Sequence, residues 1–202
     1  MPPRITQMRM WCVAAMITIF GACNALTAET QSFSPPSGWL SYHGTGFSIS
    51  YPPGFTVDRH HEYEGIGSGN AILGTAFKIP ASMTEGTNLS PDSYLSVEIF
   101  PQITCTPKAF LASLSDQPPV KEDGRQWLVA NSSEGAAGNQ YDETVYALDK
   151  SVPCIAVRTV IHSTNIANYD PGTVKPFDVT QLKALFDKMR GSLQTQQPPQ
   201  KS

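Results

Sequence analysis

Histidine is the side chain of this sequence best suited to chemistry near neutral pH, because imidazole exchanges protons there and binds metal ions. The chain has four histidines: His43, His60, His61 and His162. His60 and His61 are followed by Glu62 and Glu64, which makes this segment the strongest candidate for a metal site. Adjacent side chains on an extended chain point in opposite directions, however, whereas metal ligands must converge. We therefore interpret residues 59–70 as a polar, Gly-rich loop, with a metal site as the alternative.

Nucleophilic catalysis has little support in the sequence. There is no G-x-S-x-G motif, and Gly67-Ser68-Gly69 lies in a polar loop and not at a bend from strand to helix. His162 adjoins Ser163, and Asp170 is nearby. Adjacency in sequence does not give a nucleophile, a base and an orienting acid their roles.

Phosphate binding and paired carboxylates are also poorly supported. The segment from Gly65 to Asn70 reads GxGxG, but it lacks a lysine and does not open a helix after a buried strand. Asp142 and Glu143 occupy neighbouring strand positions on opposite faces, so they do not form an acid/base pair. We expect no cofactor.

The segment from His162 to Gly172 is the best candidate for binding. It is rich in hydrogen-bonding side chains, and Pro171-Gly172 sets a tight turn. We predict that it binds a small polar ligand or the backbone of a partner, together with the 59–70 loop. Alternatively, its Asn and Ser side chains satisfy the backbone of a long connection. The candidate binding residues are His162, Ser163, Thr164, Asn165, Asn168, Tyr169, His60 and His61.

Alternation of apolar and polar residues predicts the strands that position these segments. Leu95, Val97 and Ile99 share one face of a strand at Tyr94–Phe100, whose other face carries Ser96 and Glu98. Further strands are predicted at residues 46–51, 55–57, 71–79, 126–133, 140–148 and 154–162. The short connections between the last three favour antiparallel hairpins.

Two helices are predicted. Thr106-Pro107 is a favourable helix start, with a hydroxyl cap and proline at the first position, for a helix that ends near Ser115. Asp178 caps the second helix, whose apolar stripe consists of Leu182, Leu185, Phe186 and Met189. The predicted order along the chain is strands, a helix, more strands and a second helix. With a mainly antiparallel sheet, this order indicates an α+β fold.

The first 28 residues have the organisation of a bacterial secretory signal peptide. Two arginines precede an apolar run from Trp11 to Ala22, which is too short for a permanent transmembrane helix. One prediction is cleavage after Ala25 or Ala28. The alternative is removal of residues 1–22 and lipidation of Cys23, since Phe20-Gly21-Ala22-Cys23 is similar to a lipobox.

Behind the signal we predict a disordered tether at 29–37, a single α+β domain at 38–193 and a disordered tail at 194–202. The chain has a formal net charge of −3, and loss of the two signal arginines makes it more acidic. It has no basic run, so we exclude nucleic acid as a partner. Membrane contact is expected only through a lipid on Cys23.

Export leaves two cysteines in the folded domain, Cys105 and Cys154, in an oxidising compartment. We predict a disulfide between them, with two buried thiols that never meet as the alternative. A redox-active pair is disfavoured because no C-x-x-C spacing occurs.

Three groups of residues resemble the PsbP/Mog1-like superfamily. Its opening hairpin is similar to a group made of Trp39, Tyr42, residues 46–52 and Gly54-Phe55-Thr56-Val57. Its next core strand is similar to Ser96-Val97-Glu98-Ile99, and its closing helix is similar to the segment with Phe186, Met189 and Ser192. The order of elements from residue 39 to 193 is similar as well. The resemblance implies an antiparallel sheet sandwiched by helices, an α/β/α sandwich, and a binding or assembly role without catalytic residues.

We therefore expect a non-catalytic envelope protein, periplasmic or extracellular, that binds another envelope protein or a small ligand. The alternative is an envelope hydrolase or metal-dependent enzyme that uses His60, His61 or His162. A third possibility is a structural lipoprotein whose role is tethering.

Overall fold

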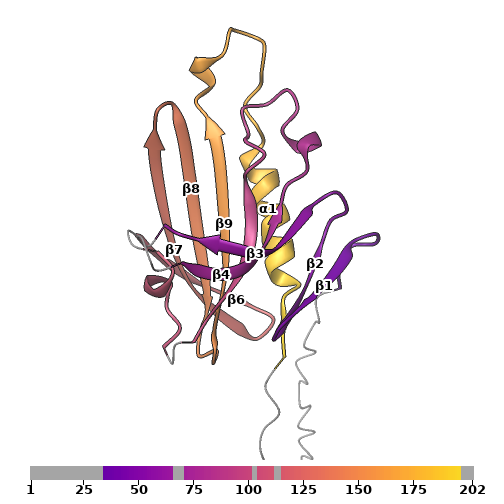
Figure 1. Cartoon of the computed structure of the whole chain (residues 1–202), viewed down its shortest axis with the longest axis vertical. Coiled ribbons are helices and arrows are strands. Elements are labelled where there is room, and N and C mark those ends of the chain that lie inside the picture. Colours follow the sequence, from indigo (N-terminus) through magenta and orange to yellow (C-terminus); the bar gives the residue numbers. More distant parts are fainter. Residues whose placement is uncertain (1–33, 66–70, 102–103, 112–114, 197–202) are drawn as a thin grey trace, which may run out of the picture.

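Two antiparallel sheets and one α-helix make up the part of the chain that the computed structural model describes, residues 34–65, 71–101, 104–111 and 115–196 (Figure 1). In spatial order, the large sheet consists of β3 (Thr56–Tyr63), β4 (Ile72–Lys78), β5 (Tyr94–Phe100), β9 (Cys154–Thr164), β8 (Asn139–Leu148), β7 (Arg125–Ala136) and β6 (Ser115–Glu122). The small sheet consists of β1 (Leu40–Gly44), β2 (Phe47–Tyr51) and β10 (Gln194–Thr195). The predicted α+β class with a mainly antiparallel sheet is confirmed.

The helix α1 (Val179–Gly191) covers one face of the large sheet. Asp178 caps it by accepting a hydrogen bond from the backbone N–H of Gln181 at 2.9 Å, as the sequence predicts. Leu182, Phe186 and Met189 are buried in a core that they share with both sheets. The apolar stripe therefore fixes which side of the helix faces the strands.

The opposite face of the large sheet has a different composition. It carries a smaller apolar cluster that includes Ile72, Phe110 and Val145, and next to it the fully buried polar residues Ser96, Glu98 and Arg158. Alternation along β5 separates the two faces, since Leu95 and Val97 belong to the core under α1.

A disulfide joins Cys105 to Cys154 on this second face, with the Cα atoms 4.8 Å apart, and the predicted pairing is confirmed. Its 49-residue separation corresponds to about 4 kcal/mol of stabilisation in the chain-entropy account of cross-links. A disulfide fits a periplasmic or extracellular location.

Two sequence-based predictions are wrong. Residues 59–63 belong to β3 and not to a loop, because they pair with β4 across a register shift between Asp58 and His61. The helix predicted from Thr106 to Ser115 is a 3-10 turn, Pro107–Ala109, and Ser115 begins β6. Within the described ranges, the α-helical layer expected on the second face is therefore missing, and a segment with one 3-10 turn lies there instead.

The ends of the domain differ from the prediction at one point. β10 begins at Gln194, inside the expected tail, because Gln194 and Thr195 pair with Ser48 and Phe47 of β2. The predicted signal, Cys23 and residues 29–33 of the predicted tether lie outside the described residues. No helix of the described part is long and apolar enough to cross a membrane.

One end of the molecule is formed by turns and long connections. The β7–β8 turn and the connection from β9 to α1 lie at the top in Figure 1, whereas β10 lies near the bottom. We call residues 135–140 and 165–169 at this upper end the tip.

Candidate functional site

The segment that follows β9 builds one wall of the tip. His162, Ser163 and Thr164 are the last residues of β9, and the 3-10 turn Ile166–Asn168 comes directly after Asn165. The Asn165 side-chain carbonyl accepts a hydrogen bond from the Ala167 N–H at 3.0 Å, which caps this turn. Asn165 thus satisfies the backbone of the connection, as the alternative interpretation predicted, and it does so through its side-chain oxygen.

The β7–β8 turn builds the facing wall. Ala137 and Gly138 occupy its corner with positive φ values of 50° and 79°. The Gly138 carbonyl accepts from the Asn165 N–H at 2.8 Å and from Asn168 Nδ2 at 3.3 Å. A Cβ atom at position 138 would lie 2.3 Å from Asn168 Nδ2. The loop can close on the hairpin because residue 138 has no side chain.

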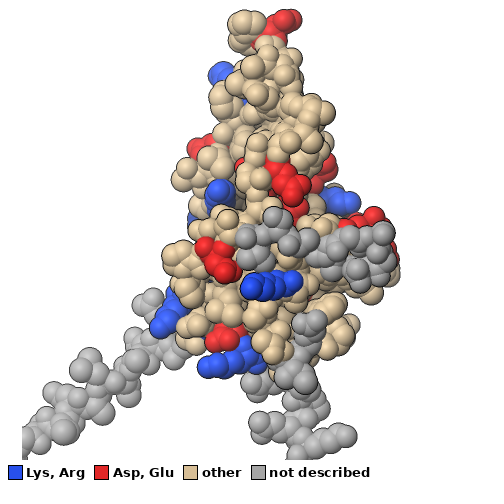
Figure 2. All heavy atoms as spheres, turned by 90° about the vertical axis from the view of Figure 1, so that its left-hand side faces the viewer, with Lys and Arg blue, Asp and Glu red and all other residues tan. Residues whose placement is uncertain are grey.

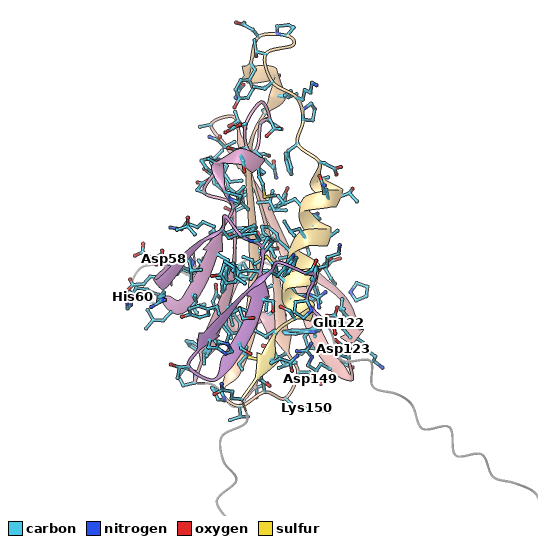
Figure 3. The ribbon with its side chains drawn as sticks, turned by 90° about the vertical axis from the view of Figure 1, so that its right-hand side faces the viewer. Asp58, His60, Glu122, Asp123, Asp149 and Lys150 are labelled. Carbon is cyan, nitrogen blue, oxygen red and sulfur yellow. A yellow bond between two sulfur atoms is a disulfide. The ribbon has the colours of Figure 1, made fainter. Side chains whose placement is uncertain are left out.

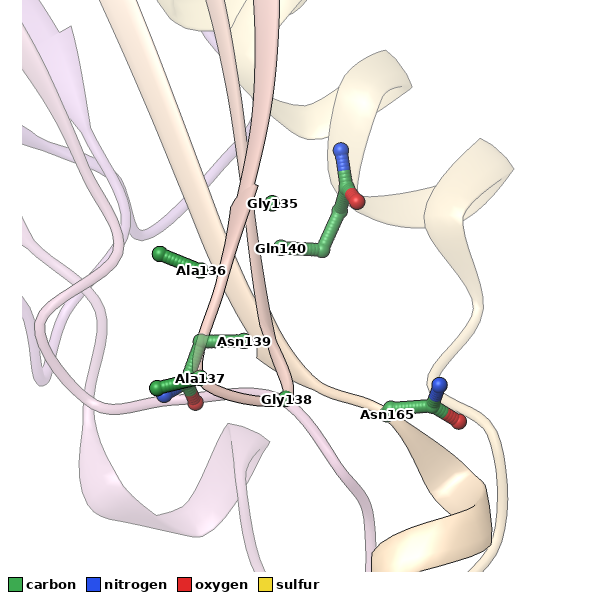
Figure 4. Close-up of a pocket in the computed structure, with 7 residues that line it drawn as sticks. All are labelled: Gly135, Ala136, Ala137, Gly138, Asn139, Gln140 and Asn165. Carbon is green, nitrogen blue, oxygen red and sulfur yellow. The ribbon is translucent and has the colours of Figure 1, made fainter.

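Between these walls lies an open pocket of about 410 Å³ (Figure 4). Figure 4 shows the amide groups of Gln140 and Asn165 on the same side of the hairpin. Three lining residues carry amide side chains and the others are glycine or alanine: Gly135, Ala136, Ala137, Gly138, Asn139, Gln140 and Asn165. Asn139 and Gln140 are successive strand residues, so their side chains lie on opposite faces of the hairpin. Asn165 is the one lining residue that the sequence singled out.

The amides of the pocket are fixed by the surrounding fold. Asn139 Oδ1 accepts a hydrogen bond from the Thr164 hydroxyl at 3.1 Å. Gln140 Nε2 donates to Ser133 Oγ at 2.6 Å and to Asp142 Oδ1 at 3.2 Å. These bonds orient the side chains before any ligand arrives, which lowers the entropic cost of binding.

Asn88 connects the tip to the rest of the molecule, and sequence reasoning missed it. Its Nδ2 donates to the Thr164 carbonyl at 2.7 Å, and its Oδ1 accepts from the Phe177 N–H at 3.0 Å. Both partners are more than 70 residues away, so no local pattern marks this residue. The β7–β8 turn did carry a signal, because Ala137-Gly138 between two predicted strands indicates a turn.

His162 lies below the tip and is held by Asp92. Its Nδ1 is 2.8 and 2.9 Å from the two carboxylate oxygens of Asp92, and its ring stacks on Tyr141 with the centroids 4.2 Å apart. Burial works against ionisation of Asp92, but hydrogen bonds from Ser90 and His162 outweigh it, so the pKa of Asp92 is lowered. The Nε2 of His162 is buried and has no hydrogen-bond partner among the described residues. Those residues contain no Ser–His–Asp arrangement at this site.

The structure separates His60 and His61 from the tip. Figure 3 places His60 at the side of the molecule, well away from the upper end. His61 packs edge-on against Tyr94 with the ring centroids 4.7 Å apart, and burial lowers the pKa of His61. Over the described ranges, no three His, Cys, Asp or Glu side chains gather to hold a metal ion.

A second polar group, which we call the Arg158 cluster (Tyr63, Glu98, Glu143 and Arg158), lies on the sheet face away from α1. Arg158 donates from Nε to Glu98 Oε1 at 2.7 Å and from Nη2 to Glu98 Oε2 at 3.0 Å, with both side chains fully buried. Its Nη1 donates to Glu143 Oε2 at 2.9 Å. This bidentate geometry is the strongest form of an arginine–carboxylate pair.

Arg158 and Tyr63 make further contacts within the Arg158 cluster. Arg158 Nη2 also donates to the Phe110 carbonyl at 2.6 Å, and the guanidinium carbon lies 3.3 Å from the centre of the Tyr63 ring. The Tyr63 hydroxyl donates to Glu143 at 2.8 Å, and burial raises the pKa of Tyr63. The cluster thus ties β3, β5, β8 and the segment around Phe110 together, and its central Arg158–Glu98 pair is fully buried.

Comparisons with known proteins add little to this geometry. No protein-family model matches this chain, and no curated protein matches it. A crystal structure from Bacteroides thetaiotaomicron VPI-5482 is similar with a TM-score of 0.45 and 12% sequence identity, covering 82% of this chain and 50% of that one. The chain spans about half the length of that protein.

Proposed function

We propose that this protein is an exported bacterial envelope protein that acts by binding an envelope protein or a small ligand, without catalysis. We propose further that its domain is of the PsbP/Mog1-like type and that the tip is its recognition surface. A secretory-type N-terminal sequence and the Cys105–Cys154 disulfide support export to a periplasmic or extracellular location.

The observation that carries the binding role is the open pocket at the tip. Gln140 and Asn165 hold their amides on the same side of the hairpin, and each is already anchored through one part of its amide (Figure 4). A small-molecule site needs a concave surface and a few polar groups with fixed orientation, and the tip has both. The Arg158 cluster is polar too, but its groups are satisfied by one another.

The tip also lies far from the small sheet. Pro35, near the start of the described chain, lines a small pocket with residues of β1, β2 and β10. If Cys23 carries a lipid, the chain would enter the domain from this end, and the tip would point away from the membrane (Figure 1). Such an orientation suits a domain that contacts other envelope components.

A binding assay in the native bacterium tests this proposal. Asn165→Ala with Gln140→Ala removes two pocket amides, and Gln181→Ala with Gln194→Ala removes two exposed amides elsewhere. After cross-linking and affinity capture, we expect the first pair to lose the components that wild type captures and the second pair to keep them. Equal capture by both pairs would refute the tip as the recognition surface.

Hydrolysis is the second candidate function, because Asp92 holds His162 Nδ1 as an orienting carboxylate holds a catalytic base. The buried Nε2 and the stacked Tyr141 oppose this role, since a substrate must reach that nitrogen. Hydrolysis of a simple phenyl ester that is lost in His162→Gln would support the enzyme; equal rates in both proteins would rule it out.

A further inference from the structure

The two sheets of the described chain have four edge strands, and three of them carry features that oppose further pairing. β3 has a register shift between Asp58 and His61, and β6 has one between Gln117 and Val120, where two prolines interrupt the strand. β10 pairs over two residues only. Bulges, prolines and short strands are common ways in which proteins protect the edges of their sheets.

The fourth edge strand, β1, has none of these features. Its five residues pair with β2 in one continuous register from Leu40 to Gly44, and they include no proline, acidic residue, lysine or arginine. β1 is the end strand of the small sheet and lies at the outer rim of the molecule (Figure 1), where the side chains of the described surface are charged only in places (Figure 2). β1 is therefore an unprotected edge that another strand can extend.

The hydrogen bonds of β2 show which backbone groups of β1 point outward. The N–H and the carbonyl of Ser50 are both bonded to the Ser192 hydroxyl, at 2.9 and 3.2 Å, on the side of β2 where β10 lies. Ser41 lies opposite Ser50, and opposite residues of an antiparallel pair either exchange both bonds or both point away. The N–H and carbonyl of Ser41, and by alternation those of His43, therefore point to the open edge. No described residue forms a hydrogen bond with these four groups.

The two faces of β1 indicate the side chains that an added strand should carry. Leu40 and Tyr42 share the face towards the core, where Tyr42 packs against Phe77 with the ring centroids 5.6 Å apart. Leu40 is 46% exposed, so an apolar side chain beside it would remove apolar surface from water. Ser41 and His43 lie on the other face, where they line a small pocket with other polar residues. Apolar and polar residues should therefore alternate in the added strand.

We infer that the open edge of β1 binds an extended segment of a partner protein in which apolar and polar residues alternate. Backbone hydrogen bonds to Ser41 and His43 hold the segment, and an apolar side chain beside Leu40 fixes its register. A second copy of this chain is a poorer occupant. Two β1 strands would meet over only about 17 Å, whereas stable interfaces bury roughly 1,200 Å² or more. This contact is separate from the tip and goes beyond the function proposed above.

The test uses the full chain labelled with nitrogen-15 and an acetylated, amidated heptapeptide of alternating threonine and valine. A second heptapeptide of the same sequence carries a methyl group on every backbone nitrogen, so it has no backbone donor. Ser41→Pro removes one outward N–H without removing a bond to β2, a change that an edge strand tolerates. Ser41→Thr is the matched control, because threonine keeps this N–H and favours a strand.

Titration followed by NMR gives the decisive comparison. We expect the first heptapeptide to shift the His43 amide resonance in wild type and in Ser41→Thr alike, and to bind Ser41→Pro about fivefold or more weakly. In wild type the methylated peptide should leave the Ser41 and His43 resonances unchanged, a comparison that needs no variant.

Three results of the titration would overturn the inference: no shift with the first peptide, equal shifts with both peptides, or shifts confined to β3 or β6. Slow hydrogen exchange at the Ser41 and His43 amides before any peptide is added would overturn it as well. The edge would then already be occupied by a second copy or by the N-terminal segment of the chain itself.

Discussion

The Arg158 cluster and the tip are two polar regions on the same sheet, and β9 contributes to both. At Arg158 the strand passes through a closed group, where the guanidinium donates to two carboxylates and a backbone carbonyl. Six residues later the strand reaches Thr164, whose hydroxyl holds Asn139 in place at the edge of an open pocket.

The difference shows how polar groups divide between stability and recognition. A buried charge is tolerated only when its partners satisfy it, and the fully buried Arg158 and Glu98 satisfy each other. The amides at the tip are anchored at one end and exposed at the other, which lets them be rigid and still bind. Substitutions in the Arg158 cluster should therefore lower the free energy of unfolding, and substitutions at the tip should weaken binding.

The largest expected effect comes from Arg158→Met. The substitution leaves Glu98 fully buried without its cation, and loss of one partner from such a pair costs about 3–5 kcal/mol of the free energy of unfolding. Urea denaturation measures this loss. The control, Arg59→Met, removes an exposed guanidinium and should change stability by less than about 0.5 kcal/mol. A similar loss in both variants would mean that the cluster is not a structural centre.

A smaller and local effect is expected from Gly138→Ala. Positive φ costs a residue with a side chain about 1–2 kcal/mol, and the new Cβ would also displace Asn168 from the hairpin. Gly124→Ala is a matched control, because Gly124 has φ of 72° and nothing within 4 Å of an added Cβ.

The comparison of these two glycines separates backbone strain from loss of the tip. We expect both variants to lose stability, Gly138→Ala more than Gly124→Ala, and only Gly138→Ala to lose ligand or partner capture. Equal capture by the two variants would show that contact between loop and hairpin is not needed for binding.

The smallest effect is a pH dependence centred on His61. Burial lowers the pKa of His61 in the folded protein, so at mildly acidic pH the unfolded chain takes up a proton that the folded chain resists. His61 therefore does not lower the free energy of unfolding above the unfolded pKa of about 6.5. As the pH falls below that value, the free energy of unfolding decreases. Between pH 7 and pH 5, wild type should lose more unfolding free energy than His61→Gln. Equal losses would contradict the assignment.

Most strands and the helix α1 were predictable because their signals are local. Leu95 and Val97 alternate with Ser96 and Glu98, and Asp178 stands three residues before the N–H that it caps. The disulfide was predictable because the predicted domain, residues 38–193, contains only two cysteines.

The incorrect predictions concern strands at the edges of the sheet. β6 contains Pro118 and Pro119 and is mostly exposed, so it lacks the alternation of a strand that is buried on one face. The segment Arg59–Tyr63 is polar for the same reason, because β3 has a neighbour on one side only. β6 is a strand because it pairs with β7, and β3 because it pairs with β4. The local sequence does not indicate either pairing.

The candidate site was predictable in part. Hydrogen-bonding composition pointed to Asn165 and its neighbours, but the β7–β8 turn and Asn88 join them only through the fold. The Arg158 cluster was missed because Arg158 and Glu98 are 60 residues apart. Spacing along the chain carries no information about such a pair.

Site-specific photo-cross-linking in the native cell tests the central claim most directly, namely that the tip is the recognition surface. A photoreactive phenylalanine analogue would replace Tyr169, 36% exposed at the tip, or Val152, 63% exposed near Asp149 and Lys150 at the opposite end (Figure 3). We predict specific cross-linked products from position 169 and none from position 152, although position 152 is more exposed. Products from position 152 alone, or the same products from both positions, would contradict the account.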